Sequence, residues 1–338
     1  MAKKSLNNNL HKAKDSKKDE YYTQLSDIEK ELKHYKKHFK NKIVYCNCDD
    51  PRISNFFHYF SYNFEKLGLK KLITTCYQSQ TMDLFSEHTS EQAIYLEYDG
   101  DKNGNNVPDP EEIGIVHLKA DGDFRSKESI ELLKQADIVI TNPPFSLFRE
   151  YISQLAEYDK KFLIIGNINA ISYKESFELI KENKMWLGYN TARHFNRPDG
   201  SLYETARSFW YTNLDIAKRH EDIILYKKYV GNESEYPKYE NFDAINVDRT
   251  ENIPVDYKGY IGVPITFLAK YNPQQFEILG LGISNSGIDV GVQPYKPEHK
   301  KFRKEIQKRG AVDGDLYMME NGEVKVPYAR VLIKNKRI

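Results

Sequence analysis

The tetrapeptide Asn142-Pro143-Pro144-Phe145 is the part of the chain best suited to chemistry. It follows residues 136–141, an Ile- and Val-rich run that predicts a strand, and open α/β sheets bind their ligands at the carboxyl ends of strands. The two prolines lack a backbone N–H and have fixed φ angles. The carbonyl oxygens of this turn are therefore rigid hydrogen-bond acceptors.

Such acceptors suit a substrate that carries an exocyclic amino group. The Asn142 side-chain oxygen and the Pro143 carbonyl oxygen can accept both amine hydrogens, which draws the nitrogen lone pair out of conjugation, while the Phe145 ring stacks on the substrate ring. Asn-Pro and Pro-Pro also occur in ordinary strand-ending turns. The strand, the second proline and the aromatic residue together favour an amino-group methylation site.

The segments around this turn alternate between strand and helix patterns. Ser26 and Glu29 have the spacing of a capping box, which predicts a helix to about residue 40. Repeated strand–helix–strand units predict a doubly wound, mostly parallel α/β sheet. The predicted strands are residues 42–46, 71–77, 136–141 and 161–167, and the predicted helices are residues 26–40, 52–66, 126–135 and 147–157.

The regular alternation ends near residue 190. Residues 190–338 mix short strands with aromatic and Arg-bearing loops and lack a sustained apolar period. We therefore expect a basic, flexible arm at residues 1–20, a catalytic domain at residues 21–190, and a smaller, irregular α+β lobe at residues 191–338 that packs partly on the core.

Composition restricts the class of protein. The chain has 338 residues and a formal net charge of only +1, so contact with a polyanion must depend on local clusters of cations. Three cysteines are too few for a disulfide framework, which predicts a reducing cytoplasm, and no Cys/His spacing predicts a metal. No apolar stretch reaches membrane-spanning length, and the basic amino terminus lacks the hydrophobic region of a signal peptide.

Acidic and aromatic residues follow two of the strand-like segments. Asp49, Asp50 and Pro51 come directly after the first strand, where a carboxylate can bind ribose hydroxyls, although an acidic turn that caps the next helix explains them equally well. Asp123 and Phe124 can accept from an adenine amino group and pack on its ring. These are the groups that a sulfonium methyl donor requires.

Four motifs give the chain a family resemblance. Residues 18–23 resemble motif X of adenine methyltransferases, residues 46–51 lie at the place of motif I, residues 122–124 resemble motif III, and residues 142–145 resemble motif IV. Longer strings resemble the EcoRI-type adenine-specific (N6) DNA modification methyltransferases. These strings are residues 44–52, 141–151 and 243–247, and the resemblance covers roughly residues 11–190 and 210–280.

The resemblance implies a Rossmann-like methyltransferase fold with a DNA-recognition lobe. It implies transfer of a methyl group from S-adenosylmethionine to N6 of an adenine flipped out of a short duplex DNA site, by a monomer of the type found in restriction-modification systems. The sequence leaves open whether a cognate endonuclease shares the site or the enzyme is solitary. The site residues are Asn142, Pro143, Pro144 and Phe145 for catalysis, and Tyr21, Tyr22, Thr23, Cys46, Asn47, Asp49, Asp50, Pro51, Asp123 and Phe124 for the cofactor.

One departure from the family pattern concerns motif I. Its usual Phe-x-Gly-x-Gly form is absent, and Cys46-Asn47-Cys48 stands in its place. The catalytic turn is thus predicted from its own residues, whereas most cofactor contacts are predicted by resemblance.

Residues that can contact DNA lie in two regions. Lysines of the arm are predicted to follow phosphates without sequence specificity, and side chains after residue 190 are predicted to reach base edges, although simple solvation explains many of them. Trp186, Tyr189 or Phe195 is expected to form the second wall of the base pocket. The predicted DNA-binding residues are Lys12, Lys14, Lys17, Lys18, Arg193, Asn196, Arg197 and Arg207.

Two other functions fit part of the sequence. The same turn serves methyltransferases that act on RNA adenine or protein glutamine, but the motif order, with motif X before motif I and a large lobe after motif IV, favours duplex DNA. The second alternative is a catalytically inactive DNA-binding module, against which the intact residues 142–145 argue. The recognition sequence does not follow from these residues.

Overall fold

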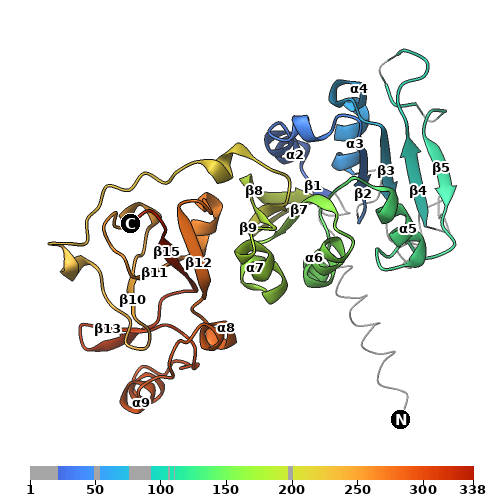
Figure 1. Ribbon diagram of the computed structural model, residues 1–338. Coiled ribbons are helices and arrows are strands. Elements are labelled where there is room, and N and C mark those ends of the chain that lie inside the picture. The colour runs from blue at the N-terminus through green and yellow to red at the C-terminus, as the bar shows by residue number, and fades with distance from the viewer. Residues whose placement is uncertain (1–21, 49–53, 76–92, 106, 110, 197–200) are drawn as a thin grey trace, which may run out of the picture. The chain divides into compact units, whose positions relative to one another are not determined.

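The computed structural model describes residues 22–48, 54–75, 93–105, 107–109, 111–196 and 201–338. The chain divides into two compact units, which are described separately (Figure 1). Unit 1 comprises Met1–Ser176 and Met185–Ile216, and unit 2 comprises Phe177–Lys184 and Ala217–Ile338.

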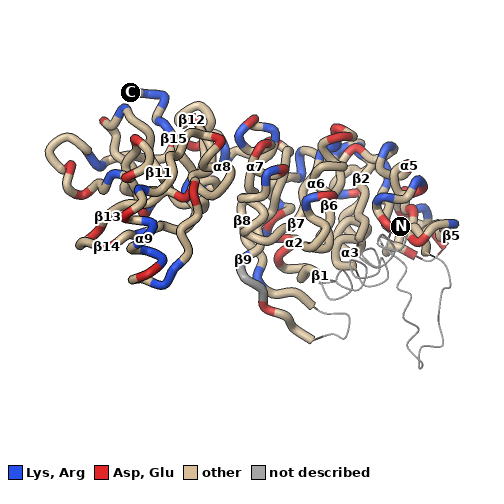
Figure 2. The backbone as a smooth tube through the Cα atoms, turned by 90° about the horizontal axis from the view of Figure 1, so that it is seen from below, with Lys and Arg blue, Asp and Glu red and all other residues tan. Residues whose placement is uncertain are grey.

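The boundary between the units differs from the predicted one at residue 190. Residues 191–216 belong to unit 1 because β8 (Trp186–Asn196) and β9 (Leu202–Thr212) complete its sheet. These strands form a long antiparallel ribbon that extends beyond the other strands (Figure 2). Unit 1 therefore ends at Ile216, because β9 is hydrogen-bonded to the central sheet. This pairing between distant segments leaves no periodic pattern in the sequence that could predict it.

The described residues of unit 1 form a nine-stranded mixed sheet of order β1-β8-β9-β7-β6-β2-β3-β4-β5. The four strands β7, β6, β2 and β3 are parallel, whereas the ladders outside them are antiparallel. The prediction of a mostly parallel sheet is right for the centre and wrong for both edges. The remaining bounds are β1 (Tyr22–Thr23), β2 (Ile43–Cys46), β3 (Lys71–Thr75), β4 (Ile94–Tyr98), β5 (Gly114–His117), β6 (Ile138–Thr141) and β7 (Lys161–Asn167).

Helices cover both faces of this sheet, which is why its central strands are apolar on both sides (Figure 1). Serine side chains cap the N-termini of two of these helices. The Ser54 hydroxyl accepts from the Phe56 N–H at 3.2 Å, and the Ser126 hydroxyl accepts from the Ser129 N–H at 3.2 Å. One face carries α2 (Leu25–Leu32), α3 (Asn55–Tyr62) and α4 (Phe64–Leu67), and the other carries α5 (Lys127–Gln135) and α6 (Phe148–Glu157).

The predicted capping box at Ser26 does not form. Helix α2 begins one residue earlier, at Leu25, with Gln24 as an N-cap whose side chain makes no capping hydrogen bond. The helix also ends at Leu32, well before residue 40. Its apolar face, which includes Ile28 and Leu32, is buried in the core, so packing stabilises this helix where the cap does not.

A buried carboxylate joins α2 to β8. Glu31 is 0% exposed and accepts hydrogen bonds from the backbone N–H groups of Tyr189 and Asn190, both at 2.8 Å, and from the Tyr35 hydroxyl at 2.8 Å. The two backbone donors lie where β8 departs from regular pairing, between Leu187 and Thr191. Glu31 therefore satisfies the backbone donors that this irregularity leaves without strand partners.

Unit 2 contains a four-stranded sheet of order β10-β11-β15-β12 and a separate two-stranded sheet. Arg330, the first residue of β15 in the four-stranded sheet, has a buried side chain. This side chain donates to Asn246 Oδ1 at 3.0 Å and to Asp248 Oδ1 at 2.6 Å. The bounds are β10 (Ala244–Asn246), β11 (Tyr260–Pro264), β12 (Phe276–Leu281), β13 (Met318–Glu320), β14 (Glu323–Lys325), β15 (Arg330–Asn335), α8 (Ser284–Asp289) and α9 (Pro297–Glu305), and α7 (Lys174–Lys181) runs from unit 1 into unit 2.

The described helices are all short. None of them has the length and apolar character needed to span a lipid bilayer.

Candidate active site

The Asn-Pro-Pro-Phe turn follows β6, as predicted. All four residues of β6 are buried between β2 and β7. Asn142 is 6% exposed and Pro143 is buried, whereas Phe145 is half-buried and begins a short 3-10 turn, Phe145–Leu147, that leads into α6. The rigid acceptors of the turn are thus held at the carboxyl edge of the central parallel strands.

Asn47 connects this turn to the loop after β2. Its backbone oxygen accepts a hydrogen bond from the Thr141 hydroxyl, and its side-chain oxygen accepts one from the Tyr151 hydroxyl. All three residues are buried, and burial raises the pKa of the Tyr151 phenol, which keeps this hydroxyl a donor. The places of motif I and motif IV are therefore joined by side chains from β6 and α6.

Phe124 extends these contacts to motif III. Its ring packs edge-to-face on Tyr151, with ring centroids 5.0 Å apart and an interplanar angle of 76°. Since Tyr151 also bonds Asn47, the residues of three motifs meet in one continuous set of contacts. Sequence reasoning did not assign Tyr151 a role. The available signal was its place on the buried face of the helix after the catalytic turn.

The carboxylate of Asp123 already has a protein partner. Arg125 donates to it from Nε at 2.9 Å and from Nη2 at 2.6 Å, and Arg125 also bonds Glu150 at 2.8 Å. Partial burial acts to raise the pKa of Asp123, but the hydrogen bonds from Arg125 outweigh it and hold the pKa below its ordinary value. A ligand that uses Asp123 must share this carboxylate with Arg125.

Replacing Arg125 with alanine is expected to destabilise the fold at pH 7 and to have less effect in acid. A carboxyl with a depressed folded-state pKa stabilises the fold above its ordinary value near 4, and this contribution is lost as the pH falls through the folded-state pKa. Urea denaturation at pH 7 and below pH 4 measures the difference. Lys127→Ala, on the exposed start of α5, is the control. An effect of Arg125→Ala that persists unchanged in acid contradicts this account.

Strand β1 brings motif X to the same region. Thr23 pairs with Phe195 of β8, and the Phe195 ring packs edge-to-face on Phe145, with centroids 6.2 Å apart and an angle of 88°. Thr23 is 1% exposed, and its hydroxyl has no hydrogen-bond partner within the described part of the chain. Buried hydroxyls are normally hydrogen-bonded, so this group is suited to bind a ligand.

The three candidates for a second wall of the base pocket have different positions. Phe195 is the one that packs on Phe145, but it is fully buried and presents its contact edge-on. The Trp186 indole donates to the Leu214 carbonyl oxygen at 3.0 Å, and Tyr189 stacks on His34 at 3.9 Å. Trp186 and Tyr189 both pack against the core of unit 1.

Cys48 adopts a backbone conformation that usually requires glycine, in the segment where the glycines of motif I are absent. Its φ angle is +78°, in the left-handed region that glycine usually occupies. Cys46 is buried in β2, and Cys48 is half-buried. The bend after β2 is therefore made at the position where the sequence departs from the family pattern.

Other predicted residues are exposed or lie elsewhere. Tyr22 and Asn196 are half-buried cross-strand partners, and Arg193 and Arg207 are exposed on the β8–β9 ribbon. Among the described residues, no group of three or more His, Cys, Asp or Glu side chains has the geometry to hold a metal ion. Outside the described residues lie Lys12, Lys14, Lys17, Lys18, Tyr21, Asp49, Asp50, Pro51 and Arg197.

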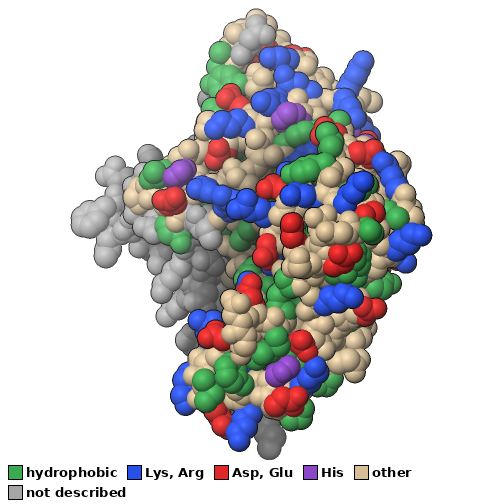
Figure 3. Space-filling view, turned by 90° about the vertical axis from the view of Figure 1, so that its left-hand side faces the viewer, with side chains coloured by type: hydrophobic (Ala, Val, Ile, Leu, Met, Phe, Trp, Pro, Cys, Tyr) green, Lys and Arg blue, Asp and Glu red, His purple; other side chains and the backbone are tan. Residues whose placement is uncertain are grey.

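Surface charge is mixed. On the face drawn in Figure 3, Lys and Arg side chains are interspersed with Asp and Glu, in keeping with the formal net charge of +1. Any nucleic-acid contact through this face therefore depends on particular side chains and not on a broad cationic surface.

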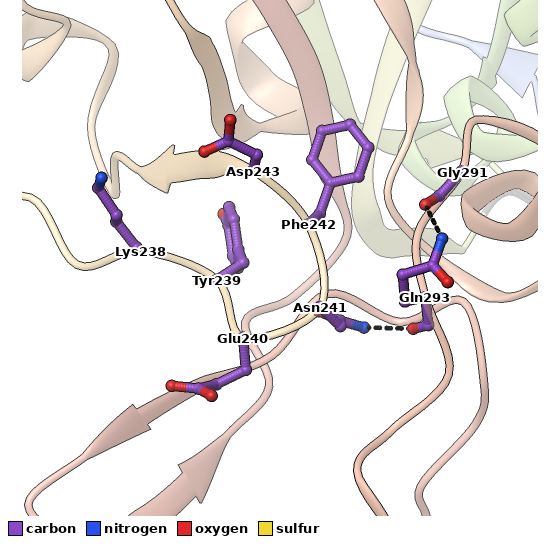
Figure 4. Close-up of a pocket in the computed structure, with 8 residues that line it drawn as sticks. All are labelled: Lys238, Tyr239, Glu240, Asn241, Phe242, Asp243, Gly291 and Gln293. Atoms are coloured by element: carbon purple, nitrogen blue, oxygen red, sulfur yellow. Dashed lines mark hydrogen bonds between the residues drawn. The ribbon is translucent and has the colours of Figure 1, made fainter.

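Unit 2 has a cavity of its own, with a volume of about 490 Å³ (Figure 4). The Asn241 amide donates to the Gln293 backbone oxygen at 2.9 Å, and the Gln293 amide donates to the Gly291 oxygen at 3.0 Å. None of the predicted catalytic or cofactor residues lines this cavity. Its lining residues are Lys238, Tyr239, Glu240, Asn241, Phe242, Asp243, Gly291 and Gln293.

Comparison with known proteins decides the family. The model of the family described as adenine-specific methyltransferase EcoRI matches residues 9–336. The chain belongs to this family. As a member of the EcoRI methyltransferase family, it is an adenine-specific methyltransferase, and the motifs that meet around Asn47 are those that carried the resemblance.

Relatives of this EcoRI-family methyltransferase match over nearly their full lengths. The chain is 49% identical to the type II methyltransferase M.EcoRI of Escherichia coli, covering 100% of this chain and 99% of the relative. It is 37% identical to M.MgeORF184P of Mycoplasma genitalium and 36% identical to M.MpnI of Mycoplasma pneumoniae, over 97% of this chain in both cases and 99% and 98% of the relatives. No solved structure matches the chain.

Proposed function

We propose that this protein transfers a methyl group from S-adenosylmethionine to N6 of an adenine flipped out of a short, specific site in duplex DNA. We also propose that it acts in the cytoplasm, as a monomer, as the modification enzyme of a type II restriction-modification system whose endonuclease shares the site. The observation that carries the proposal is the Asn142–Phe145 turn, whose acceptor residues Asn142 and Pro143 are buried and which Asn47 joins, through Thr141, to the loop after β2.

The residues of the chain fit a cofactor of this kind. Thr23 supplies a buried hydroxyl without a partner among the described residues, and Tyr22 precedes it on β1. Cys46 ends β2, and Asn47 follows it. Phe124 borders the same set of contacts through Tyr151. Together with Tyr21, Asp49, Asp50, Pro51 and Asp123, these residues would hold the cofactor, which supplies an electrophilic methyl group on a sulfonium sulfur.

The catalytic residues act on the adenine amine. The Asn142 side-chain oxygen and the Pro143 carbonyl oxygen accept its two hydrogens, and Phe145 stacks on the base. These contacts orient the nitrogen lone pair toward the methyl group and favour the positive charge that develops on nitrogen. The amine attacks directly, and its extra proton leaves afterwards, so a general base with a shifted pKa is not required.

Transfer of a labelled methyl group tests the proposal. The purified protein would be given labelled S-adenosylmethionine with unmethylated duplex DNA, structured RNA or protein acceptors, and the DNA product would be read by single-molecule sequencing. N6-methyladenine at one short motif is the expected result. Label on RNA or protein alone would support the other substrate classes of this turn, and failure to bind S-adenosylmethionine would support an inactive DNA-binding module.

The lysines of the arm are expected to control the salt dependence of DNA binding. Changing Lys12, Lys14, Lys17 and Lys18 to glutamine should flatten the slope of log affinity against log salt by up to about 4, because each phosphate contact contributes roughly 0.9. Sequence specificity should be unchanged. Four exposed lysines near α2, Lys33, Lys36, Lys37 and Lys40, provide the matched control, and an equal change in slope for both sets contradicts the prediction.

A further inference from the structure

The β8–β9 ribbon extends past the carboxyl edge of the central sheet. Strand β9 pairs with β7 only from Thr212 to Ser208, and Ser208 lies opposite Asn167, the last residue of β7. Because β9 runs antiparallel to β7, its residues 202–207 continue beyond this edge, together with residues 193–196 of β8. We call these two segments the overhang (Figure 2).

The catalytic turn lies at the same edge. Strand β6 runs parallel to β7, and Asn142 follows its carboxyl end. The overhang also touches the turn directly, because Phe195 packs on Phe145. One side of the overhang therefore supports the residue that stacks on the target base, and all of these residues belong to unit 1.

Exposed polar side chains occupy the rest of the overhang. His194 and Glu204 are cross-strand partners, and Arg193 and Arg207 lie beside a shift in the pairing register. All four are exposed, and none of their side chains makes a hydrogen bond or ion pair with another described residue. They are therefore available to a ligand at the carboxyl edge.

We propose that the overhang enters the major groove of the DNA beside the flipped adenine and that Arg193, His194, Glu204 and Arg207 read the neighbouring bases. This inference rests on the proposed function. The major groove is wide enough to admit a two-stranded β-ribbon. Arginine bonds the guanine edge in a bidentate manner, and a carboxylate accepts from the cytosine N4 amino group.

Glu204 distinguishes base reading from simple attraction to phosphates. A carboxylate next to the DNA backbone would be repelled by phosphate charge, whereas base edges in the groove offer it an amino donor. A mixed set of cations and an acid thus fits the groove better than the backbone. The determinants of specificity are then carried by the catalytic unit itself, in contact with the base pocket.

Specificity ratios test the inference. Arg193→Ala, Glu204→Ala and Arg207→Ala would be compared with the unaltered enzyme on a library of duplexes that carry every single-base change around the methylated adenine. For at least one variant, kcat/KM for the original site relative to a changed site should fall by roughly 5- to 150-fold at one base-pair position, the range for one lost bidentate contact. Lys33→Ala, an exposed cation on the outer surface of unit 1, is the control and should leave every ratio unchanged.

The possible outcomes separate the inference from the proposed function. Ratios that stay within two-fold at all positions in all three variants would overturn base reading by the overhang. A uniform loss on all sites with a flatter salt dependence would also overturn it, since that result indicates phosphate contact. If the unaltered enzyme methylates no DNA, the proposed function fails and the inference fails with it. A variant that merely folds less well loses activity equally on every site.

Discussion

Replacement of Asn142 by alanine is expected to slow methyl transfer in a single turnover by at least about 100-fold, the scale for removal of one preorganised polar group from a catalytic site. Its amide oxygen is one of the two acceptors that orient the target amine, and the other, the Pro143 carbonyl, is fixed by the backbone. Affinity for duplex DNA should remain within a few-fold, because phosphate contacts supply most of it. Rapid-quench measurement with saturating enzyme isolates this step.

Two further variants make the Asn142 test specific. Asn142→Asp keeps an oxygen acceptor at the same place and should retain more activity than the alanine variant. Asn167→Ala removes the same side chain from the end of the neighbouring strand β7, where it caps a 3-10 turn, and should slow transfer much less. If Asn142→Ala retained turnover within a few-fold of the unaltered enzyme, the catalytic role would be wrong.

Replacement of Glu31 by alanine is expected to lower the free energy of unfolding by about 3 kcal/mol or more, because it leaves several buried donors without acceptors. These donors are the backbone N–H groups of Tyr189 and Asn190, the Asn190 side-chain amide and the Tyr35 hydroxyl. For a unit of this size the midpoint of thermal unfolding should fall by roughly 6–12 °C. Calorimetry or circular dichroism against temperature measures the shift.

Matched changes on the same helix show whether burial causes the effect. Glu31→Gln keeps one acceptor oxygen and should cost less than the alanine change. Glu29→Ala, two residues earlier and exposed, should alter the unfolding free energy by no more than about 0.5 kcal/mol. Equal effects at Glu29 and Glu31 would show that helix propensity, and not the buried network, determines the loss.

The centre of the fold follows from local patterns, and the edges do not. Strands β2, β3, β6 and β7 are short β-branched runs separated by helices, and this alternation was sufficient to predict a parallel core. Residues 191–216 gave no such signal, because β8 has irregular pairing and exposed polar side chains on its overhang. Strand β8 pairs with β1 and β9 through backbone hydrogen bonds. These bonds join segments that are separate in the sequence, so a local pattern of residue types does not predict them.

The candidate site shows the same division. Asn142, Pro143 and Phe145 were predicted because the chemistry lies within one short segment. Tyr151 was not singled out, because its importance comes from contacts with residues far away in sequence. Thr23 was predicted from its motif, but only the fold shows that its hydroxyl is buried and has no partner among the described residues. The Asp123 carboxylate was predicted to be available to adenine, yet Arg125, only two residues later, bonds it. Spacing places an acid at a strand end but does not show which neighbour it binds.

Asn47 also has a thermodynamic consequence. A single residue bonds Thr141, which precedes the catalytic turn, and Tyr151, which packs on Phe124, so a ligand that orders either side restricts the other. Occupancy of the cofactor side should then change the affinity for DNA containing the target adenine, and linkage requires the DNA to change cofactor affinity by the same factor. The two substrates of the reaction are in this sense effectors of one another.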